Sequence, residues 1–131
     1  MSRPSTAVAS KKRMRKTADD LCRKLAHARG HCEAAGFDDV ECSGRLEWSH
    51  IIGRGYMQVR WDDDNYTCCC HAHHFYFTNH DLAADRFHTG YLGAEHFAAL
   101  RLRAEQQMGN FIDYDAIIER LRTRVAEVEA A

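Results

Sequence analysis

Residues 46–80, LEWSHIIGRGYMQVRWDDDNYTCCCHAHHFYFTNH, carry the densest set of chemically active side chains in the chain. The stretch places His50, Asn65 and His74 in order, with fourteen and eight residues between them. A neutral imidazole can accept a proton near physiological pH, an amide can orient its neighbours, and a second imidazole can bind a metal ion. Each of these residues alone is more often structural, but together they indicate a hydrolytic site.

Cysteine and histidine residues around this stretch have the spacing of a zinc site. Cys70 and His73 are separated by two residues, which lets two ligands converge on one ion. Cys32 and Cys42 are separated by nine residues, and the turn residues between them can fold this insert into a finger. Zinc prefers four tetrahedral ligands. We therefore expect a structural Zn²⁺ site with the ligands Cys32, Cys42, Cys70 and His73.

The register of this site stays open because three cysteines are consecutive. Cys68 and His71 have the same spacing as Cys70 and His73, and Cys69 can replace a neighbour. A disulfide framework is the alternative use of six cysteines, but such a framework rarely contains three in a row. The chain also shows no signal-peptide pattern and no apolar stretch that could span a membrane. We expect a cytoplasmic protein.

Basic charge is concentrated near the N-terminus. Residues 1–30 hold nine lysines and arginines against two acidic residues, and the rest of the chain holds nine against seventeen. A basic segment on an acidic body suits binding to a phosphate backbone by counterion release, and the alternative is a solubilising tail without a partner. The candidate DNA-binding residues in this segment are Lys11, Lys12, Arg13, Arg15 and Lys16.

The sequence predicts a mixture of helices and short strands within one domain over residues 17–131. Residues 1–16 are small, polar and basic, and we expect them to be disordered until bound. Thr17 is the expected N-cap of a helix that Gly30 ends. The other expected elements are an irregular segment at 31–44, strands at 46–52 and 59–61, and helices at 70–77, 94–108 and 114–128. The apolar stripe of the last helix indicates core or a dimer surface.

Several further side chains have an expected role beside the candidate site. Arg54 and Arg60 flank it and can grip a phosphate by bidentate contacts, although a solvated loop charge is the alternative for both. The aromatic residues are expected to build the core rather than stack on bases, and these are Trp48, Trp61, Phe75 and Phe77.

Three segments of the chain resemble the HNH endonuclease motif, also called the ββα-metal nuclease fold: residues 48–52, 60–65 and 70–80. The chain is most similar to the small phage-type HNH proteins with an embedded zinc site, over residues 32–80. The resemblance implies an α+β fold with a small zinc-stabilised ββα core, flanking helices within 94–128 and a basic N-terminal arm.

The same resemblance implies a role for each signature residue. His50 would be the general base, Asn65 its orienting residue, and His74 a ligand of a catalytic divalent cation such as Mg²⁺, Mn²⁺ or Ni²⁺. The substrate would be DNA, cut to leave 5′-phosphate and 3′-hydroxyl ends. Phage ancestry implies action in the cytoplasm of a bacterial host cell, with a terminase as a candidate partner.

The sequence departs from the family pattern at one ligand position. Many members have Asp or His immediately before the base, whereas this chain has Ser49. A histidine one turn after His74 is also missing, because Thr78 stands there. Asn79 or His80 is an alternative ligand, but their offset of five or six residues does not suit a straight helix, so we expect His74, water and the DNA phosphates to hold the ion. Two rival interpretations follow: a zinc-stabilised DNA-binding module without catalysis, and a structural zinc protein that assembles through its C-terminal helix.

Overall fold

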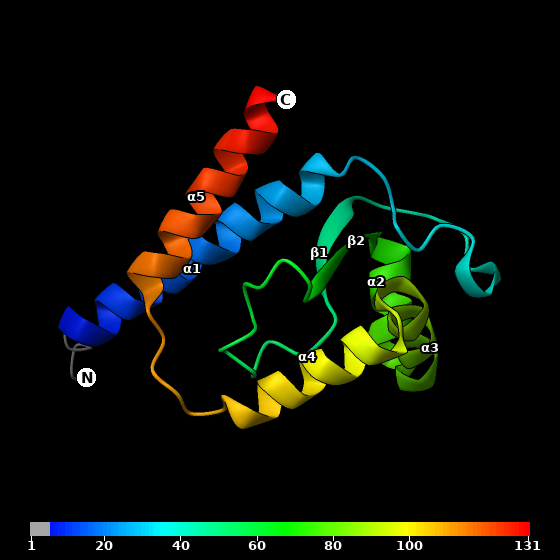
Figure 1. The fold of residues 1–131 in the computed structure, drawn as a ribbon. Helices are drawn as coiled ribbons and strands as arrows, with labels where there is room; N and C mark the ends of the chain where they lie inside the picture. Colours follow the sequence, from blue (N-terminus) through cyan, green and yellow to red (C-terminus); the bar gives the residue numbers. More distant parts are fainter. Residues whose placement is uncertain (1–5) are drawn as a thin grey trace, which may run out of the picture.

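The structure is a computed structural model that describes residues 6–131, in which five α-helices and a short 3-10 helix accompany a two-stranded sheet (Figure 1). The expected α+β class is confirmed. No helix within these residues combines the length and apolar character needed to cross a membrane. The elements are α1 (Thr6–Ala28), η1 (Phe37–Asp39), β1 (Leu46–His50), β2 (Tyr66–Cys70), α2 (His71–Asn79), α3 (Asp81–Leu92), α4 (Ala94–Gln106) and α5 (Tyr114–Ala130).

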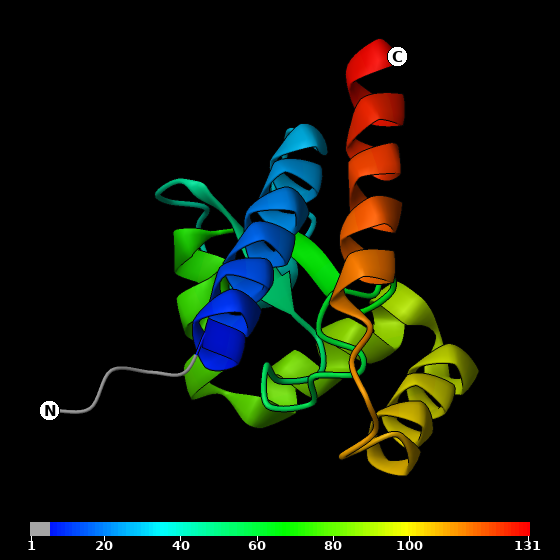
Figure 2. The same cartoon turned by 90° about the vertical axis from the view of Figure 1, so that its left-hand side faces the viewer.

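The N-terminal helix α1 and the C-terminal helix α5 lie side by side in both views (Figures 1 and 2). Their contact belongs to the main hydrophobic cluster, which also includes Trp48 and Trp61. Small residues on α1 let the helices approach closely, and larger aliphatic residues on α5 fill the contact. The buried members on the two helices are Ala18, Cys22, Leu25, Ala26, Ile118, Leu121 and Val125. The apolar stripe of α5 is therefore core.

The prediction of a disordered arm is wrong for residues 6–16, which form the first part of α1. Residues 1–5 of the predicted arm lie outside the described residues. Thr17 is not an N-cap: it lies inside α1, and its hydroxyl donates to the Arg13 carbonyl at 3.0 Å. Met14 packs against the main cluster, so tertiary packing extends a helix that composition alone leaves unassigned. The basic side chains are thus presented on a helix.

The two strands pair antiparallel, with Trp48 opposite Cys68 and Ser49 opposite Thr67. Side chains alternate along β1, so Glu47 and Ser49 share one face. The predicted second strand at 59–61 is wrong, because these residues lie in turns. The true strand β2 is buried at all five positions, so it lacks the alternation that marks a half-buried strand.

The buried carboxylate of Asp19, on α1, anchors the long connection between the two strands. Asp19 accepts hydrogen bonds from Nε and Nη2 of Arg60, at 3.0 and 2.7 Å, and from Nε1 of Trp61 at 2.8 Å. Burial raises the pKa of Asp19, but these donors outweigh it and the net pKa is lowered. Arg60 is therefore engaged in a buried ion pair, and its predicted role as a phosphate contact is wrong.

Substitution of Asp19 tests this anchor. We expect Asp19→Asn to lower the free energy of unfolding by about 3 kcal/mol, because it leaves the buried charge of Arg60 without its partner. Because the folded-state pKa of Asp19 is lowered, its contribution should be present above about pH 4 and lost as the pH falls further. The matched control is Asp20→Asn, whose ion pairs are exposed and contribute about 0.5 kcal/mol. Equal effects in urea unfolding would contradict the anchor.

The finger at residues 31–44 packs on α2 and α3 in a second hydrophobic cluster that includes Phe77 and Phe87. Asp38 holds it there, since it accepts a hydrogen bond from the Tyr76 hydroxyl at 2.8 Å and forms an ion pair with Arg86 at 2.7 Å. The helix α3 was not predicted from the sequence. Phe75 is 63% exposed, so its expected place in the core is wrong.

Candidate functional site

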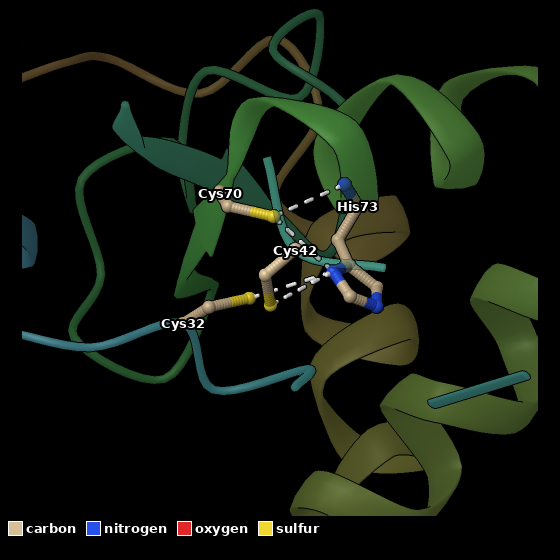
Figure 3. Close-up of side chains that lie close together, drawn as sticks. All are labelled: Cys32, Cys42, Cys70 and His73. Atoms are coloured by element: carbon tan, nitrogen blue, oxygen red, sulfur yellow. Dashed lines mark hydrogen bonds between the residues drawn. The ribbon is translucent and has the colours of Figure 1, made fainter. Parts of the chain in front are cut away.

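The four predicted ligands Cys32, Cys42, Cys70 and His73 come together in one cluster (Figure 3). Their ligand atoms all lie within 4.8 Å of one another. Nδ1 of His73 lies 3.2 Å from Sγ of Cys70 and 3.7 Å from Sγ of both Cys32 and Cys42. The cluster can therefore hold a metal ion, and the predicted set of four residues is the one that the structure brings together.

The spacing of the cluster agrees with tetrahedral coordination. With typical zinc bond lengths, a sulfur and a nitrogen ligand atom lie about 3.6 Å apart in a tetrahedral site. The register among the consecutive cysteines is also resolved. Cys68 and Cys69 are fully buried outside the cluster, and burial raises the pKa of these thiols to about 11 and about 12. They behave as small apolar residues.

Cys70 links the sheet, the helix α2 and the cluster. It is the last residue of β2 and the N-cap of α2, and its Sγ accepts a hydrogen bond from the backbone N–H of His73 at 3.5 Å. Burial raises the pKa of the Cys70 thiol, but this N–H and the His73 ring outweigh burial and bring the pKa down to about 6. A thiolate therefore forms readily at the position where a cation would bind.

The candidate base His50 lies at the end of β1. Its Nε2 contacts the carbonyl oxygen of Arg60 at 3.1 Å. Because a carbonyl only accepts, Nε2 carries the hydrogen and Nδ1 is left as a proton acceptor. Burial lowers the pKa of His50 to about 4, although the Arg60 carbonyl partly opposes this shift. The ring is therefore neutral at physiological pH, as a general base must be.

This protonation state can be measured directly. We expect the imidazole of His50 to remain neutral down to about pH 5, because burial disfavours its charged form. Since the unfolded chain takes up this proton near the ordinary pKa of about 6.5, His50 should contribute less stability as the pH falls from 6.5 to 4. NMR titration of the histidine ring resonances checks this. A His50 midpoint at or above 6.5 in the folded protein would contradict the expectation.

Asn65 lies just before β2 and closes the connection that begins after His50, at the end of β1. Its side chain is fully buried. Oδ1 accepts from the Ile52 N–H at 2.6 Å, and Nδ2 donates to the carbonyls of Ile52 and Val59 at 3.2 and 2.9 Å. Asn65 thus holds the loop at two points, and its side-chain hydrogen bonds go to the backbone of Ile52 and Val59 and not to His50. Its orienting action would pass through the backbone of residues 51 and 52.

His74 contacts a carboxylate that the sequence did not single out. Nδ1 of His74 lies 2.9 Å from Oε1 of Glu47, and Nδ1 of His71 lies 3.3 Å from the same atom. A carboxylate accepts, so Nδ1 of His74 carries the hydrogen and its Nε2 is left to bind an ion. The signal that could have identified Glu47 is its position two residues before Ser49, on the same face of the strand.

One cavity joins the base and the candidate ligand. It has a volume of about 360 Å³, and Ser49, His50 and His74 line it together with Asp81 and Asp85 from α3. The two acids face the cavity from consecutive turns of that helix. The buried His88, which had no expected role, lies in the same wall.

The residues proposed to replace the missing ligand do not line this cavity. Nδ2 of Asn79 donates to the Phe75 carbonyl at 2.8 Å, and Nδ1 of His80 contacts the Tyr76 carbonyl at 2.8 Å. Both side chains therefore bond to the backbone of α2. The carboxylates of α3 line the cavity instead, and the alternative of Asn79 or His80 as the missing ligand is not supported by this arrangement.

The chain matches no protein-family model, no curated protein and no solved structure. The functional argument therefore depends on the geometry of the cluster and the cavity.

Proposed function

We propose that the protein is a metal-dependent DNA endonuclease of the HNH type, with zinc in the Cys3His cluster. The observation that supports this best is the shared cavity, which is lined by His74, by the neutral His50 and by the carboxylates of α3. His73 and His74 are adjacent in α2, so the metal cluster would fix the helix that carries the candidate catalytic ligand.

His50 would act as the general base. The oxygen of a water molecule forms a bond to phosphorus, and its proton passes to Nδ1 of His50. The bond between phosphorus and the 3′ oxygen breaks, and the electron pair stays on that oxygen. A proton from solvent completes the 3′-hydroxyl, and the other fragment keeps the 5′-phosphate. The hydrogen bond from Nε2 to the Arg60 carbonyl becomes stronger as the ring gains charge.

His74 would hold a divalent cation, Mg²⁺, Mn²⁺ or Ni²⁺, through Nε2. When bound, such a cation stabilises negative charge on the phosphate and on the leaving oxygen. Glu47 positions His74 by accepting from Nδ1. Ser49 is a poor ligand, and Asp81 is the carboxylate of the cavity that makes no ion pair with any side chain of residues 10–131. Asp81 is thus the carboxylate of the cavity that is most available as an oxygen ligand.

The experiment that tests this function measures plasmid cleavage while Mn²⁺ is titrated, for the wild type and for His74→Ala. We expect the variant to need at least about tenfold more Mn²⁺ for half-maximal cleavage, because it lacks a ligand. Binding of Mn²⁺ measured by calorimetry should weaken in parallel. Full cleavage by His74→Ala at limiting metal would exclude His74 as the ligand.

A zinc-stabilised DNA-binding module without catalysis is the second candidate, and Ser49 is the observation in its favour. It predicts that the wild type binds DNA and leaves it intact at every metal concentration.

The resemblance to phage proteins further supports the proposal of a terminase partner in a bacterial host, which a pull-down with that enzyme would test.

A further inference from the structure

A second cleft adjoins the cavity that holds His50. It has a volume of about 400 Å³ and receives Arg23 and His27 from α1, Arg45 from the segment before β1, and Arg54 from the loop after it. Arg54 and His74 line both the cleft and the cavity, so these two hollows lie next to each other. Four basic side chains from three separate parts of the chain therefore converge beside the candidate catalytic ligand.

The two hollows differ in charge. The second cleft has three arginines against one carboxylate, Glu47, which His74 and His71 already contact. The cavity has one arginine against two carboxylates, of which Asp85 pairs with Arg101 at 2.7 Å and Asp81 makes no ion pair with any side chain of residues 10–131. An acidic hollow attracts a cation and a basic hollow attracts an anion. The boundary between them, at Arg54 and His74, is where a cation and a phosphate would meet.

The arginines of this cleft keep donors available. The side chain of Arg54 is exposed and makes no ion pair with residues 10–131. Arg45 is 86% exposed, and a single contact of 3.4 Å joins its Nε to Oε2 of Glu47. Arg23 pairs with the exposed Asp20 through one nitrogen, Nη1. In contrast to Arg60, each guanidinium can still present N–H groups to a ligand, and such planar groups match phosphate oxygens.

The wall of the cleft is firmly built. Nε2 of His27 contacts the Leu46 carbonyl at 2.8 Å and so ties α1 to the start of β1. Trp48, which is 3% exposed, lines the same cleft and packs in the main hydrophobic cluster, so the floor of the cleft is fixed by the core.

We propose that this basic cleft, lined by Arg23, His27, Arg45 and Arg54, binds a backbone phosphate of the DNA strand next to the phosphate that is cleaved. The ligand class is a phosphodiester, which is recognised through charge and not through base sequence. The proposal rests on the proposed function, because that function identifies the anion as DNA. It also assigns the positioning of the strand to the C-terminal half of α1, beyond the basic residues 11–16.

The test compares two double variants that each remove two positive charges. Arg23→Gln with Arg45→Gln removes charge from the cleft, whereas Lys24→Gln with Arg122→Gln removes it from α1 and α5 outside the cleft. All proteins carry His50→Ala so that DNA stays intact, and zinc content and thermal unfolding are checked first. Fluorescence anisotropy then gives the affinity for a short DNA duplex over a range of salt concentrations.

We expect the cleft variant to bind at least about tenfold more weakly, with a salt dependence reduced by about two counterions. The control variant should keep the slope of the unaltered protein. Equal losses in both variants, or no loss in the cleft variant, would overturn the proposal. Because binding is measured without cleavage, failure of the nuclease activity would leave this result unaffected, and the two outcomes are distinguishable.

Discussion

Replacement of His50 by alanine is expected to reduce the rate of DNA cleavage by at least about 100-fold, which is the usual contribution of a general base. His50 is an imidazole of the cavity that burial keeps neutral, and its Nε2–H is fixed by the Arg60 carbonyl, which leaves Nδ1 as the acceptor. Burial also keeps His88 neutral in the same cavity, but His88 lies on α3 and not at the end of β1, so we do not expect it to replace the base. DNA binding should remain, because the basic side chains are unchanged.

The matched control for this substitution is His96→Ala. His96 is half exposed and contacts Asp64 at 2.9 Å, away from the residues that line the cavity. Cleavage by His96→Ala should stay within about twofold of the wild type, since surface substitutions of this kind have small effects. A His50→Ala protein that keeps its metal content and its full cleavage rate would exclude His50 as the base.

Cys70→Ser is expected to release the metal of the Cys3His cluster and to lower the melting temperature by at least about 10 °C. Cys70 is at once a candidate ligand, the N-cap of α2 and the residue that joins β2 to the finger. Loss of the ion would remove the link that Cys70 and His73 provide between the finger and α2, leaving the Asp38 contacts, so the effect should exceed that of a single buried thiol. Elemental analysis and thermal unfolding give the two readouts.

Cys69→Ala is the control for this prediction. Cys69 is fully buried in the neighbouring position, but it lies outside the cluster. The variant should keep the metal ion of the Cys3His cluster and lose only the packing of one small side chain. If Cys70→Ser retained both the ion and the melting temperature of the wild type, the cluster would have no structural role.

The metal cluster could be predicted from the sequence because its second pair has a spacing that suits one ion. The closure of the first pair was harder to foresee. Cys32 and Cys42 approach each other because Asp38 ties the finger to Tyr76 and Arg86, and these residues are distant in the sequence. Only the folded chain shows which cysteine of the consecutive three faces the finger.

The errors in the predicted elements have a common physical cause, namely burial by distant segments. The helix α1 begins before Thr17, and Met14 packs there against the cluster that α1 shares with α5, a contact that no local signal reports. The strand at 66–70 is covered on both faces, so its pattern is uniform. Tryptophan is a residue type that is common in strands, but the indole N–H of Trp61 donates to Asp19 and keeps the segment in a turn.

In the candidate site, too, the sequence order predicted some residues, whereas others are brought in from distant parts of the chain. The order of His50, Asn65 and His74 led to the prediction of a hydrolytic site, and the structure places His50 and His74 in one cavity, while the roles of all three stay predictions. The residues that accompany them come from other elements: Glu47 on β1 contacts His74, and Asp81, which lines the same cavity, belongs to a helix that was not predicted. Arg60 was misassigned because its partner, Asp19, lies on α1.

The most direct test of the proposed nuclease is incubation of supercoiled plasmid with the metal-loaded wild type and Mg²⁺, Mn²⁺ or Ni²⁺, beside the His50→Ala variant. The account predicts open-circular or linear DNA that forms only with added divalent metal and only with the wild type, with 5′-phosphate ends. A folded, metal-loaded wild type that binds the plasmid and leaves it supercoiled with every cation would contradict the account and favour the DNA-binding module.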